Sequence, residues 1–177
     1  MSEAPVNANV VIRPFQLQDA AAVRELFIVI NRQLAPGDQR EAFEAYIARS
    51  LTEEIDRIAE YYGEKHGGFW VAERDGGVVG MFGLERVAPD AMELRRMYVD
   101  PAARRLGIAR SMLEFAEAEC RRAWARRLEL STSELQPAAQ ELYRRSGYRL
   151  VREEFAQAAS NKTVGGGIRR FYFEKEM

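Results

Sequence analysis

A short basic turn in the middle of the chain combines residue types that bind phosphate groups. It lies in the stretch Met97-Tyr98-Val99-Asp100-Pro101-Ala102-Ala103-Arg104-Arg105-Leu106-Gly107-Ile108-Ala109, where a strand is expected to end and a helix to begin. Free backbone N–H groups and the helix dipole attract anions at a helix start, and glycine lets a ligand approach the backbone closely. The cations available are Arg104, Arg105 and Arg110. The turn predicts a phosphate site, with an ordinary helix start that happens to contain Gly and Arg as the alternative.

Two common nucleotide-binding patterns are absent from this turn. No Gly-Lys-Ser/Thr follows it, so it is not a P-loop. The pattern Gly-x-Gly-x-x-Gly is also missing, so it is not a dinucleotide fingerprint. A small polyanion of another kind is the expected ligand.

Composition argues against several other classes of function. The chain has 177 residues and a formal net charge of -1, without the basic excess that nucleic-acid binders usually carry. A single cysteine, Cys120, and a single histidine, His66, argue against a disulfide or a metal site, and Cys120 is expected in the core. No segment is apolar for long enough to cross a bilayer, and the N-terminus does not resemble a signal peptide. We expect a cytoplasmic protein without nucleic-acid or membrane partners.

Hydrophobic periodicity indicates which elements position the turn. Segments of period two, bounded by turn residues, predict strands at 10–13, 69–73, 78–85, 92–99, 128–132, 148–153 and 170–175. Segments of period 3.6 predict helices at 19–34, 43–62, 108–124 and 136–146. This order is typical of an α/β protein with a mixed sheet flanked by helices. Residues 156–168 are predicted to be a mobile loop, and the charges of residues 40–65 to lie on a solvated helix face.

Two separated motifs resemble a known family. Arg104-x-x-Gly107-x-Ala109 is similar to the Q/R-x-x-G-x-G/A motif of GNAT acetyltransferases, and the strand 93–99 before it resembles their fourth strand. The later segment 135–148, LQPAAQELYRRSGY, resembles their N-x-x-A-x-x-x-Y-x-x-x-G-F segment. The similarity covers about residues 10–175, and both motifs stand in the right order on the right elements. Residues 130–136 also resemble, more loosely, the branch that acetylates cysteine conjugates and aspartate.

The resemblance implies a fold and a cofactor. The fold is a single domain over residues 1–177, with a central, mostly antiparallel sheet of six to seven strands whose fourth and fifth strands splay apart around the pantetheine of acetyl-coenzyme A. The residues implied in binding acetyl-coenzyme A are Met97, Tyr98, Val99, Arg104, Arg105, Gly107, Ile108, Ala109, Arg110, Gln136 and Tyr143. Arg105 replaces a frequent glycine, Ala109 replaces the last glycine, and Gln136 stands where asparagine is common. Gln136 is equally well explained as a turn residue before Pro137.

The resemblance also implies catalytic roles. Tyr143 matches the general acid that protonates the departing thiolate, with a core aromatic as the alternative role. Glu93 matches a glutamate that accepts a proton from the incoming ammonium, with a solvated strand-edge carboxylate as the alternative. Glu85 and Ser133 are further candidates for the base, and ordered water alone could also serve.

The implied function is transfer of an acetyl group to a primary amine, with a small molecule such as an amino acid or an amine metabolite as the acceptor. Two alternatives stay open. The chain could bind acyl-coenzyme A as a sensor without turnover, or it could acetylate a protein amine. A long open groove would favour a peptide acceptor, whereas a closed pocket would favour a metabolite. The last strand could also pair with a second copy of the chain in a homodimer.

Overall fold

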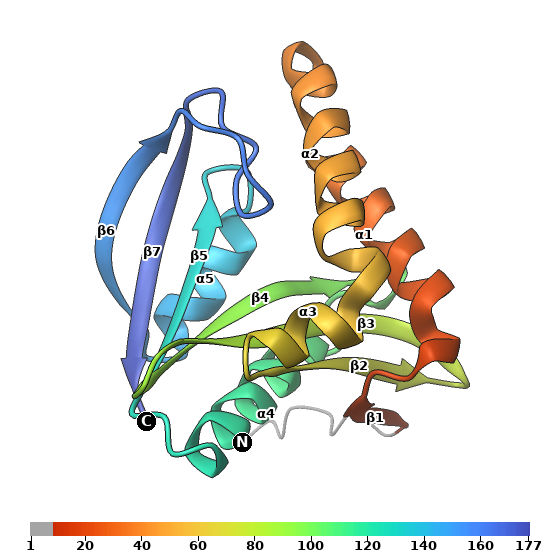
Figure 1. Ribbon diagram of the computed structural model, residues 1–177, viewed down its shortest axis with the longest axis vertical. Helices are drawn as coiled ribbons and strands as arrows, with labels where there is room; N and C mark the ends of the chain where they lie inside the picture. Colours follow the sequence, from red (N-terminus) through yellow and green to blue (C-terminus); the bar gives the residue numbers. More distant parts are fainter. Residues whose placement is uncertain (1–8) are drawn as a thin grey trace.

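Alternating apolar residues and short turns build a seven-stranded sheet in the computed structural model, which describes residues 9–177 (Figure 1). The strands are β1 (Val10–Pro14), β2 (Gly68–Arg74), β3 (Gly77–Ala88), β4 (Ala91–Val99), β5 (Arg127–Ser133), β6 (Arg149–Ala156) and β7 (Ile168–Glu176). The helices are α1 (Ala20–Leu34), α2 (Arg40–Glu53), α3 (Ile58–Glu64), α4 (Ile108–Arg122) and α5 (Pro137–Arg145). The predicted mixed sheet flanked by helices is therefore confirmed.

The strand order is β1-β2-β3-β4-β5-β7-β6. Every neighbouring pair is antiparallel except β4 and β5, which are parallel because α4 forms the crossover between them. The turn between β2 and β3 has positive φ angles at Asp75 and Gly76, as a tight hairpin requires. The parallel pair puts the C-terminal ends of β4 and β5 on the same side of the sheet.

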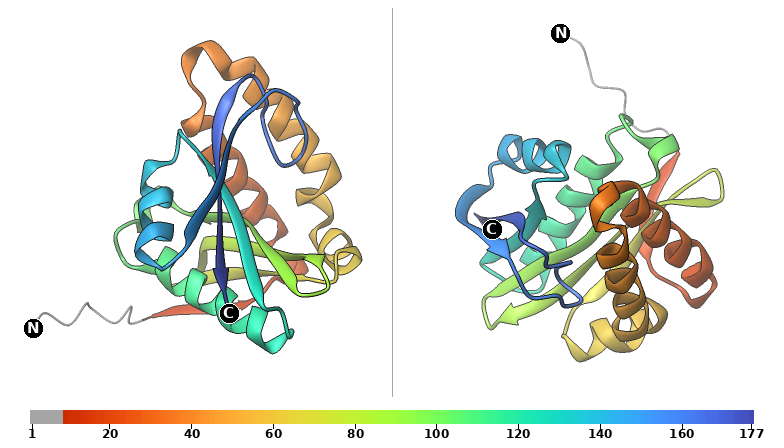
Figure 2. Two further views of the ribbon diagram at one scale, coloured as in Figure 1. Left: turned by 90° about the vertical axis from the view of Figure 1, so that its left-hand side faces the viewer. Right: turned by 90° about the horizontal axis from the view of Figure 1, so that it is seen from above.

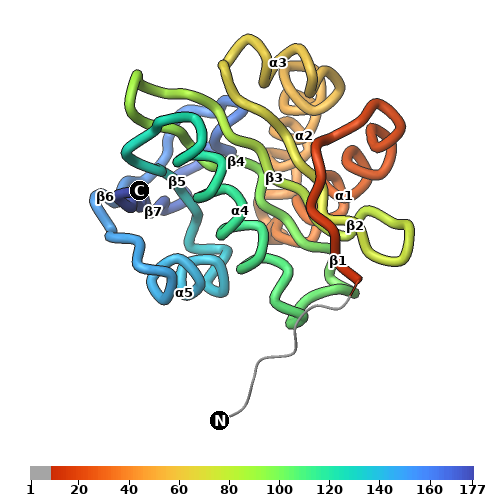
Figure 3. The backbone as a smooth tube through the Cα atoms, turned by 90° about the horizontal axis from the view of Figure 1, so that it is seen from below, coloured from red at the N-terminus to blue at the C-terminus, as the bar shows by residue number. Residues whose placement is uncertain are grey.

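Helices cover both faces of the sheet (Figure 3). One core joins α4 and α5 to the face that carries Phe82 and Leu84 of β3. The other joins α1, α2 and α3 to the opposite face, where Met81 of the same strand is buried. Because successive strand residues point to opposite faces, one strand supplies both cores. None of the helices in the described range combines the length and the apolar character that a membrane crossing needs.

The second predicted helix is not continuous. Instead of one helix over residues 43–62, α2 ends at Glu53, a short 3-10 turn follows at Ile55–Arg57, and α3 starts at Ile58. Glu54 has φ -140° and ψ -63°, and its side chain is fully buried. The prediction that the charges of residues 40–65 lie on a solvated face is therefore wrong for Glu54, because its carboxylate pairs with arginines inside the protein.

The segment between β6 and β7 returns toward α2 (Figure 2). Arg49 on α2 donates a hydrogen bond to the carbonyl of Ala159 at 2.7 Å, and Asn161 donates to Glu54 at 3.2 Å. These contacts join residues more than 100 positions apart in the sequence. The predicted mobility of this loop stays a prediction, but the loop has a defined place against the site described next.

Candidate active site at the parting of two strands

β4 and β5 pair for only part of their length. Their hydrogen-bonded register runs from Ala91 with Arg127 to Leu94 with Leu130 and then stops. Beyond Leu94, β4 pairs only with β3, and β5 pairs only with β7. A cavity of about 420 Å³ lies where the two strands part, within the size range of small-molecule sites. The backbone edges of both strands are therefore available to a ligand.

A bulge in β4 turns two consecutive arginines toward the same helices. The register with β3 shifts between Gly83, opposite Arg95, and Met81, opposite Tyr98. Arg96 has a φ of 56°, which is unusual for a residue other than glycine. Without the bulge, neighbouring side chains would point to opposite faces of the sheet. With it, both Arg95 and Arg96 reach Glu54, next to α2.

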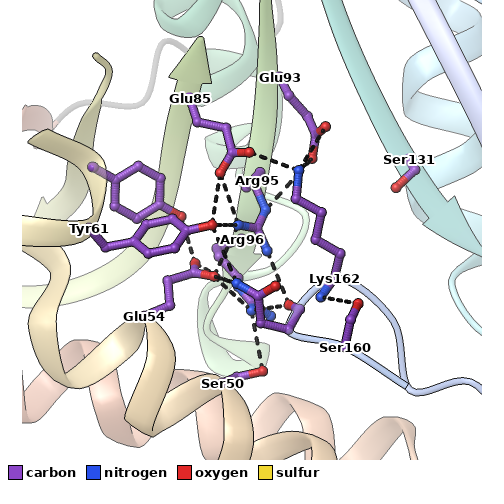
Figure 4. A network of polar contacts seen from close by, with 12 residues as sticks. Ser50, Glu54, Tyr61, Glu85, Glu93, Arg95, Arg96, Ser131, Ser160 and Lys162 are labelled. Carbon is purple, nitrogen blue, oxygen red and sulfur yellow. Dashed lines mark hydrogen bonds and ion pairs between the residues drawn. The ribbon is translucent and has the colours of Figure 1, made fainter. Parts of the chain in front are cut away.

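Six charged side chains form a network on this side of the sheet (Figure 4). We call it the arginine–glutamate network, and its members are Arg95, Arg96, Lys162, Glu54, Glu85 and Glu93. Arg96 contacts both carboxylate oxygens of Glu54, through Nε at 2.9 Å and Nη2 at 3.0 Å. Lys162 Nζ lies 2.8 Å from Glu85 and 3.3 Å from Glu93. Three cations are therefore balanced by three carboxylates, which makes the burial of Arg95, Arg96 and Glu54 possible.

Hydroxyl and carbonyl groups complete the network. Tyr46 accepts from Arg96 at 2.6 Å, Tyr61 accepts from Arg95 at 2.7 Å, and Tyr62 donates to Glu54 at 2.7 Å. The carbonyl of Asn161 accepts from Arg96 at 2.5 Å and from Arg95 at 3.1 Å. Both arginines are therefore fixed in position by the helices on one side and by the loop between β6 and β7 on the other.

The three carboxylates of the network differ in acidity. Burial alone would raise the pKa of Glu54, but Arg96 and Arg95 outweigh it and hold that pKa below its usual value. Burial is likewise outweighed at Glu85, where Lys162 and Arg95 lower the pKa. At Glu93 burial prevails over Lys162 and Arg95, so its pKa is raised. Glu93 is thus the carboxylate of the network that accepts a proton most readily.

Tyr143 lines the same cavity from α5. Its side chain is 5% exposed, and its ring packs beside those of Tyr148 and Phe173, with centroids 6.0 Å and 5.9 Å away. Burial, assisted by Tyr98, raises the pKa of the phenol well above its usual value. The hydroxyl therefore carries its proton at neutral pH, and burial makes it a weaker acid than a tyrosine in water.

The basic turn before α4 has the backbone shape of an anion site. Arg105 has a φ of 64° and Gly107 a φ of 76°. Within residues 9–177, no N–H from position 105 to 110 is bonded to a backbone carbonyl. Successive free N–H groups at a helix start form a concavity that favours phosphate groups. The positive φ of Arg105 is also a physical reason why glycine is favourable at that position.

Comparison with known proteins agrees with this geometry. Residues 65–150 match the model of the acetyltransferase (GNAT) domain. These residues are a GNAT acetyltransferase domain. This GNAT domain holds β2 to β5, α4 and α5, which surround the parting of the strands.

Three known proteins resemble this chain over different shares of their length. Human N-acetylaspartate synthetase is 36% identical over 116 residues, which are 62% of this chain and 37% of the human protein, so the chain spans about a third of that relative. An uncharacterized N-acetyltransferase of Escherichia coli, YjgM, is 28% identical over 78% of this chain and 81% of its own length. The structure of yncA, a putative acetyltransferase from Salmonella typhimurium with its cofactor acetyl-CoA, has a TM-score of 0.72 at 20% identity and covers 96% of this chain and 94% of its own.

The residues that the GNAT motifs single out lie in two groups. Glu93, Met97, Tyr98, Gln136 and Tyr143 line the cavity. Val99 follows at the end of β4, and the turn residues Arg104, Arg105, Gly107, Ile108, Ala109 and Arg110 lie outside the cavity lining, at the start of α4.

Three further residues that the sequence analysis names, Gln136, Ser133 and Glu85, have hydrogen-bond partners within the chain. The amide oxygen of Gln136 accepts from Thr132 at 3.2 Å, so part of its hydrogen-bonding capacity is used within the chain. Ser133 accepts from the backbone N–H of Leu135 at 3.2 Å, as in a local turn. Glu85 has a lowered pKa and bonds to Tyr61, Arg95 and Lys162, which makes it a poor proton acceptor.

Sequence reasoning missed most of the arginine–glutamate network. The sequence pattern marks Arg95 and Arg96 only as part of a strand, and Lys162 only as part of a loop. The sequence does carry one indication for Glu54. Tyr46, Ser50 and Glu54 follow one another at intervals of four residues, so Glu54 comes directly after α2 on the side that its buried residues face. No local pattern marks Arg95, Arg96 or Lys162 as members, because their partners come from distant segments.

Proposed function

We propose that this chain transfers the acetyl group of acetyl-coenzyme A directly to the primary amine of a small acceptor. The observation that carries the proposal is that Glu93 and Tyr143 line one cavity, at the place where β4 and β5 part. One group is suited to accept a proton and the other to donate one. Such a pair is what amine attack on a thioester needs.

The binding of acetyl-coenzyme A is supported by two features. The free N–H groups from position 105 to 110, together with Arg104 and Arg105, would hold the pyrophosphate at the start of α4. The unpaired edge of β4 at Met97 and Tyr98 would bind the amide groups of the pantetheine arm. Bound there, acetyl-coenzyme A would supply an activated acetyl thioester.

The two proton transfers follow from the residues. Glu93 takes a proton from the acceptor ammonium, directly or through a water molecule, and so frees the nitrogen lone pair for attack. The new bond is N–C and the broken bond is C–S. Tyr143 donates its proton to the departing sulfur, and the second proton that the nitrogen loses on becoming an amide returns to the Tyr143 phenolate through water. Because burial raises its pKa, Tyr143 carries this proton in the free protein.

A small acceptor is favoured over a protein chain. The loop between β6 and β7 covers one side of the cavity and is tied to Arg95, Arg96 and α2. The cavity of about 420 Å³ has room for an amino-acid-sized molecule beside the end of the pantetheine arm. The similarity to a protein named N-acetylaspartate synthetase is consistent with an amino acid acceptor.

The proposal is tested by thermal melting with and without acetyl-coenzyme A, followed by thiol release against a panel of amines. We expect a stabilising shift with the cofactor and thiol release with at least one small amine. A shift without release from small amines or peptides would favour the sensor alternative. Release with peptides alone would favour a protein acceptor, and no shift at saturating cofactor would contradict the proposal altogether.

Tyr143→Phe is the sharpest single variant. It removes the proton donor while keeping the ring in its packing, so we expect kcat to fall by roughly 100-fold or more with KM for acetyl-coenzyme A nearly unchanged. The control is Tyr148→Phe, because Tyr148 is equally buried but its hydroxyl bonds to Glu117, away from the cavity. Steady-state kinetics that show equal kcat for Tyr143→Phe and the unmodified protein would assign Tyr143 a packing role only.

A further inference from the structure

The cavity is lined by five cationic side chains, and four of them have carboxylate partners. The paired ones are Arg95, Arg96, Arg152 and Lys162. The fifth is Arg170 on β7. Within residues 9–177, no carboxylate oxygen lies within 4.0 Å of Arg170. A half-buried guanidinium without a counter-ion, on the wall of a cavity, indicates a place where an anionic ligand binds.

The surroundings of Arg170 explain why it stays unpaired. Glu154 faces it across the β6–β7 pair, but that carboxylate is taken by the hydroxyl of Tyr172 at 2.5 Å and by Arg152 at 3.4 Å. The one side-chain hydrogen bond of Arg170 goes from Nη2 to Ser131 Oγ, at 2.9 Å. Ser131 therefore fixes the direction of the guanidinium, while its remaining N–H groups are left for a ligand.

Arg170 and Ser131 line the cavity on the side where the acceptor would bind. Glu93 faces Glu129 across the β4–β5 pair, and Ser131 follows Glu129 by two residues, so all three share one face of the sheet. Two residues along a strand span about 6.6 Å. Figure 4 shows Ser131 on β5, across from Glu93 on β4. Arg170 faces Ser133 across the β5–β7 pair, so Glu93, Ser131 and Arg170 line one cavity from the same face of the sheet.

We propose that Arg170, oriented by Ser131, binds the carboxylate of the acceptor, and that the acceptor is therefore an amino acid or a similarly small amino carboxylate. This inference rests on the proposed acetyl transfer and gives it a substrate class. A planar guanidinium binds a carboxylate through two parallel hydrogen bonds, which fixes orientation as well as charge. With the carboxylate held at Arg170, the amine of the acceptor points toward Glu93.

The test compares amino acids with the analogues in which each carboxylate in turn is a carboxamide. The protein as it stands should prefer at least one carboxylate form in kcat/KM. Arg170→Gln should raise KM for that acceptor by roughly 10- to 100-fold and remove the preference, while KM for acetyl-coenzyme A stays unchanged. Arg170→Lys should restore part of the preference, because lysine keeps the positive charge but lacks the planar guanidinium that binds a carboxylate through two parallel hydrogen bonds.

Arg169→Gln is the matched control. Arg169 is the neighbour of Arg170 on β7, but it does not line the cavity and pairs instead with Glu153. Its variant should keep the preference for the carboxylate. An equal preference in Arg170→Gln, or no preference for carboxylates in the unmodified protein, would overturn the assignment of Arg170.

A second readout separates this inference from the proposed function. Calorimetry measures the binding of the same amino acids and amides to the coenzyme A-loaded protein, without any turnover. Carboxylate binding that depends on Arg170, without thiol release from any amine, would support the anchor and overturn the acetyl transfer. Thiol release with equal use of carboxylates and carboxamides would support the acetyl transfer and overturn the anchor.

Discussion

At the scale of single residues, chemically identical side chains differ because of their neighbours. Glu54 and Glu93 are both shielded from water, yet the pKa of Glu54 is lowered and that of Glu93 is raised. Glu54 contacts Arg96 through both oxygens, whereas Glu93 has only the longer contacts to Lys162 and Arg95, at 3.3 Å and 3.7 Å. Strong pairing keeps one carboxylate charged, and weak pairing leaves the other able to take a proton.

Lys162→Met tests this balance. The ammonium of Lys162 lowers the pKa of Glu93, so its removal raises that pKa further. If Glu93 acts as the base, the acidic limb of the pH profile of kcat/KM moves to higher pH. Arg49→Met is the control, because Arg49 ties the same loop through Ala159 and does not line the cavity. If the acidic limb moves equally in both variants, the shift comes from detachment of the loop and not from the lost charge of Lys162. If the limb does not move in Lys162→Met, Glu93 is excluded as the titrating base.

At the scale of elements, the turn before α4 depends on backbone conformation as much as on charge. Gly107 is the residue before the first turn of α4 and has a left-handed φ of 76°. A side chain at this position is strained and also enters the concavity formed by the free N–H groups. The neighbouring Arg105 tolerates a similar φ of 64°, so strain alone does not prevent the turn from forming.

Gly107→Glu therefore separates binding from folding. We expect the affinity for acetyl-coenzyme A, measured by calorimetry, to fall more than about 10-fold, because a carboxylate would repel the pyrophosphate at the helix start. Gly76→Glu is the matched control, since Gly76 has a φ of 80° in the hairpin between β2 and β3, and a Cβ atom added there would meet nothing within 4 Å. An equal loss of affinity in the two variants would contradict the binding of the pyrophosphate at this turn.

At the scale of the whole molecule, the arginine–glutamate network connects segments that the sheet alone does not join. Glu54 follows α2, Glu85 lies on β3, Arg95 and Arg96 lie on β4, and the loop between β6 and β7 contributes Asn161. The network fixes the wall of the cavity opposite β5. It also makes the stability of the protein sensitive to the loss of Glu54, Arg95 or Arg96, because the partner of each would stay buried and unpaired.

Glu54→Gln should destabilise the protein by about 3 kcal/mol or more at neutral pH, because it leaves Arg96 without its counter-charge. The pKa of Glu54 is lowered in the folded state, so its stabilising effect is complete above the pKa of the unfolded chain, near ~4.3, and fades as pH falls further. The difference between variant and parent in urea unfolding should shrink accordingly. Glu53→Gln, at an exposed neighbour on α2, should have little effect at any pH. A loss of similar size at both positions would contradict a special role for Glu54.

Much of the fold and part of the site could be predicted from local sequence. Strand and helix periodicity, the hairpin at Asp75 and Gly76, and the small residues Gly107 and Ala109 depend on neighbours within a few positions. The same holds for the two motifs that placed Glu93 and Tyr143 on the elements where the structure has them. The break in the predicted second helix could not be read this way, because it follows from the burial of Glu54.

The sequence by itself determined the order of the elements and the turn before α4, since these depend on short-range conformational preferences, and its two motifs carried the resemblance to the GNAT family. Only the tertiary structure decided which charges meet. The bulge at Arg96 turns two arginines to one face, and the loop between β6 and β7 brings Lys162 to Glu93. The pairing of β5 with β7 places Arg170 beside Ser131, and Arg152 and Tyr172 occupy the carboxylate of Glu154 that faces it in the described chain. Charges from distant segments interact only after folding removes the water between them, so no local pattern specifies them.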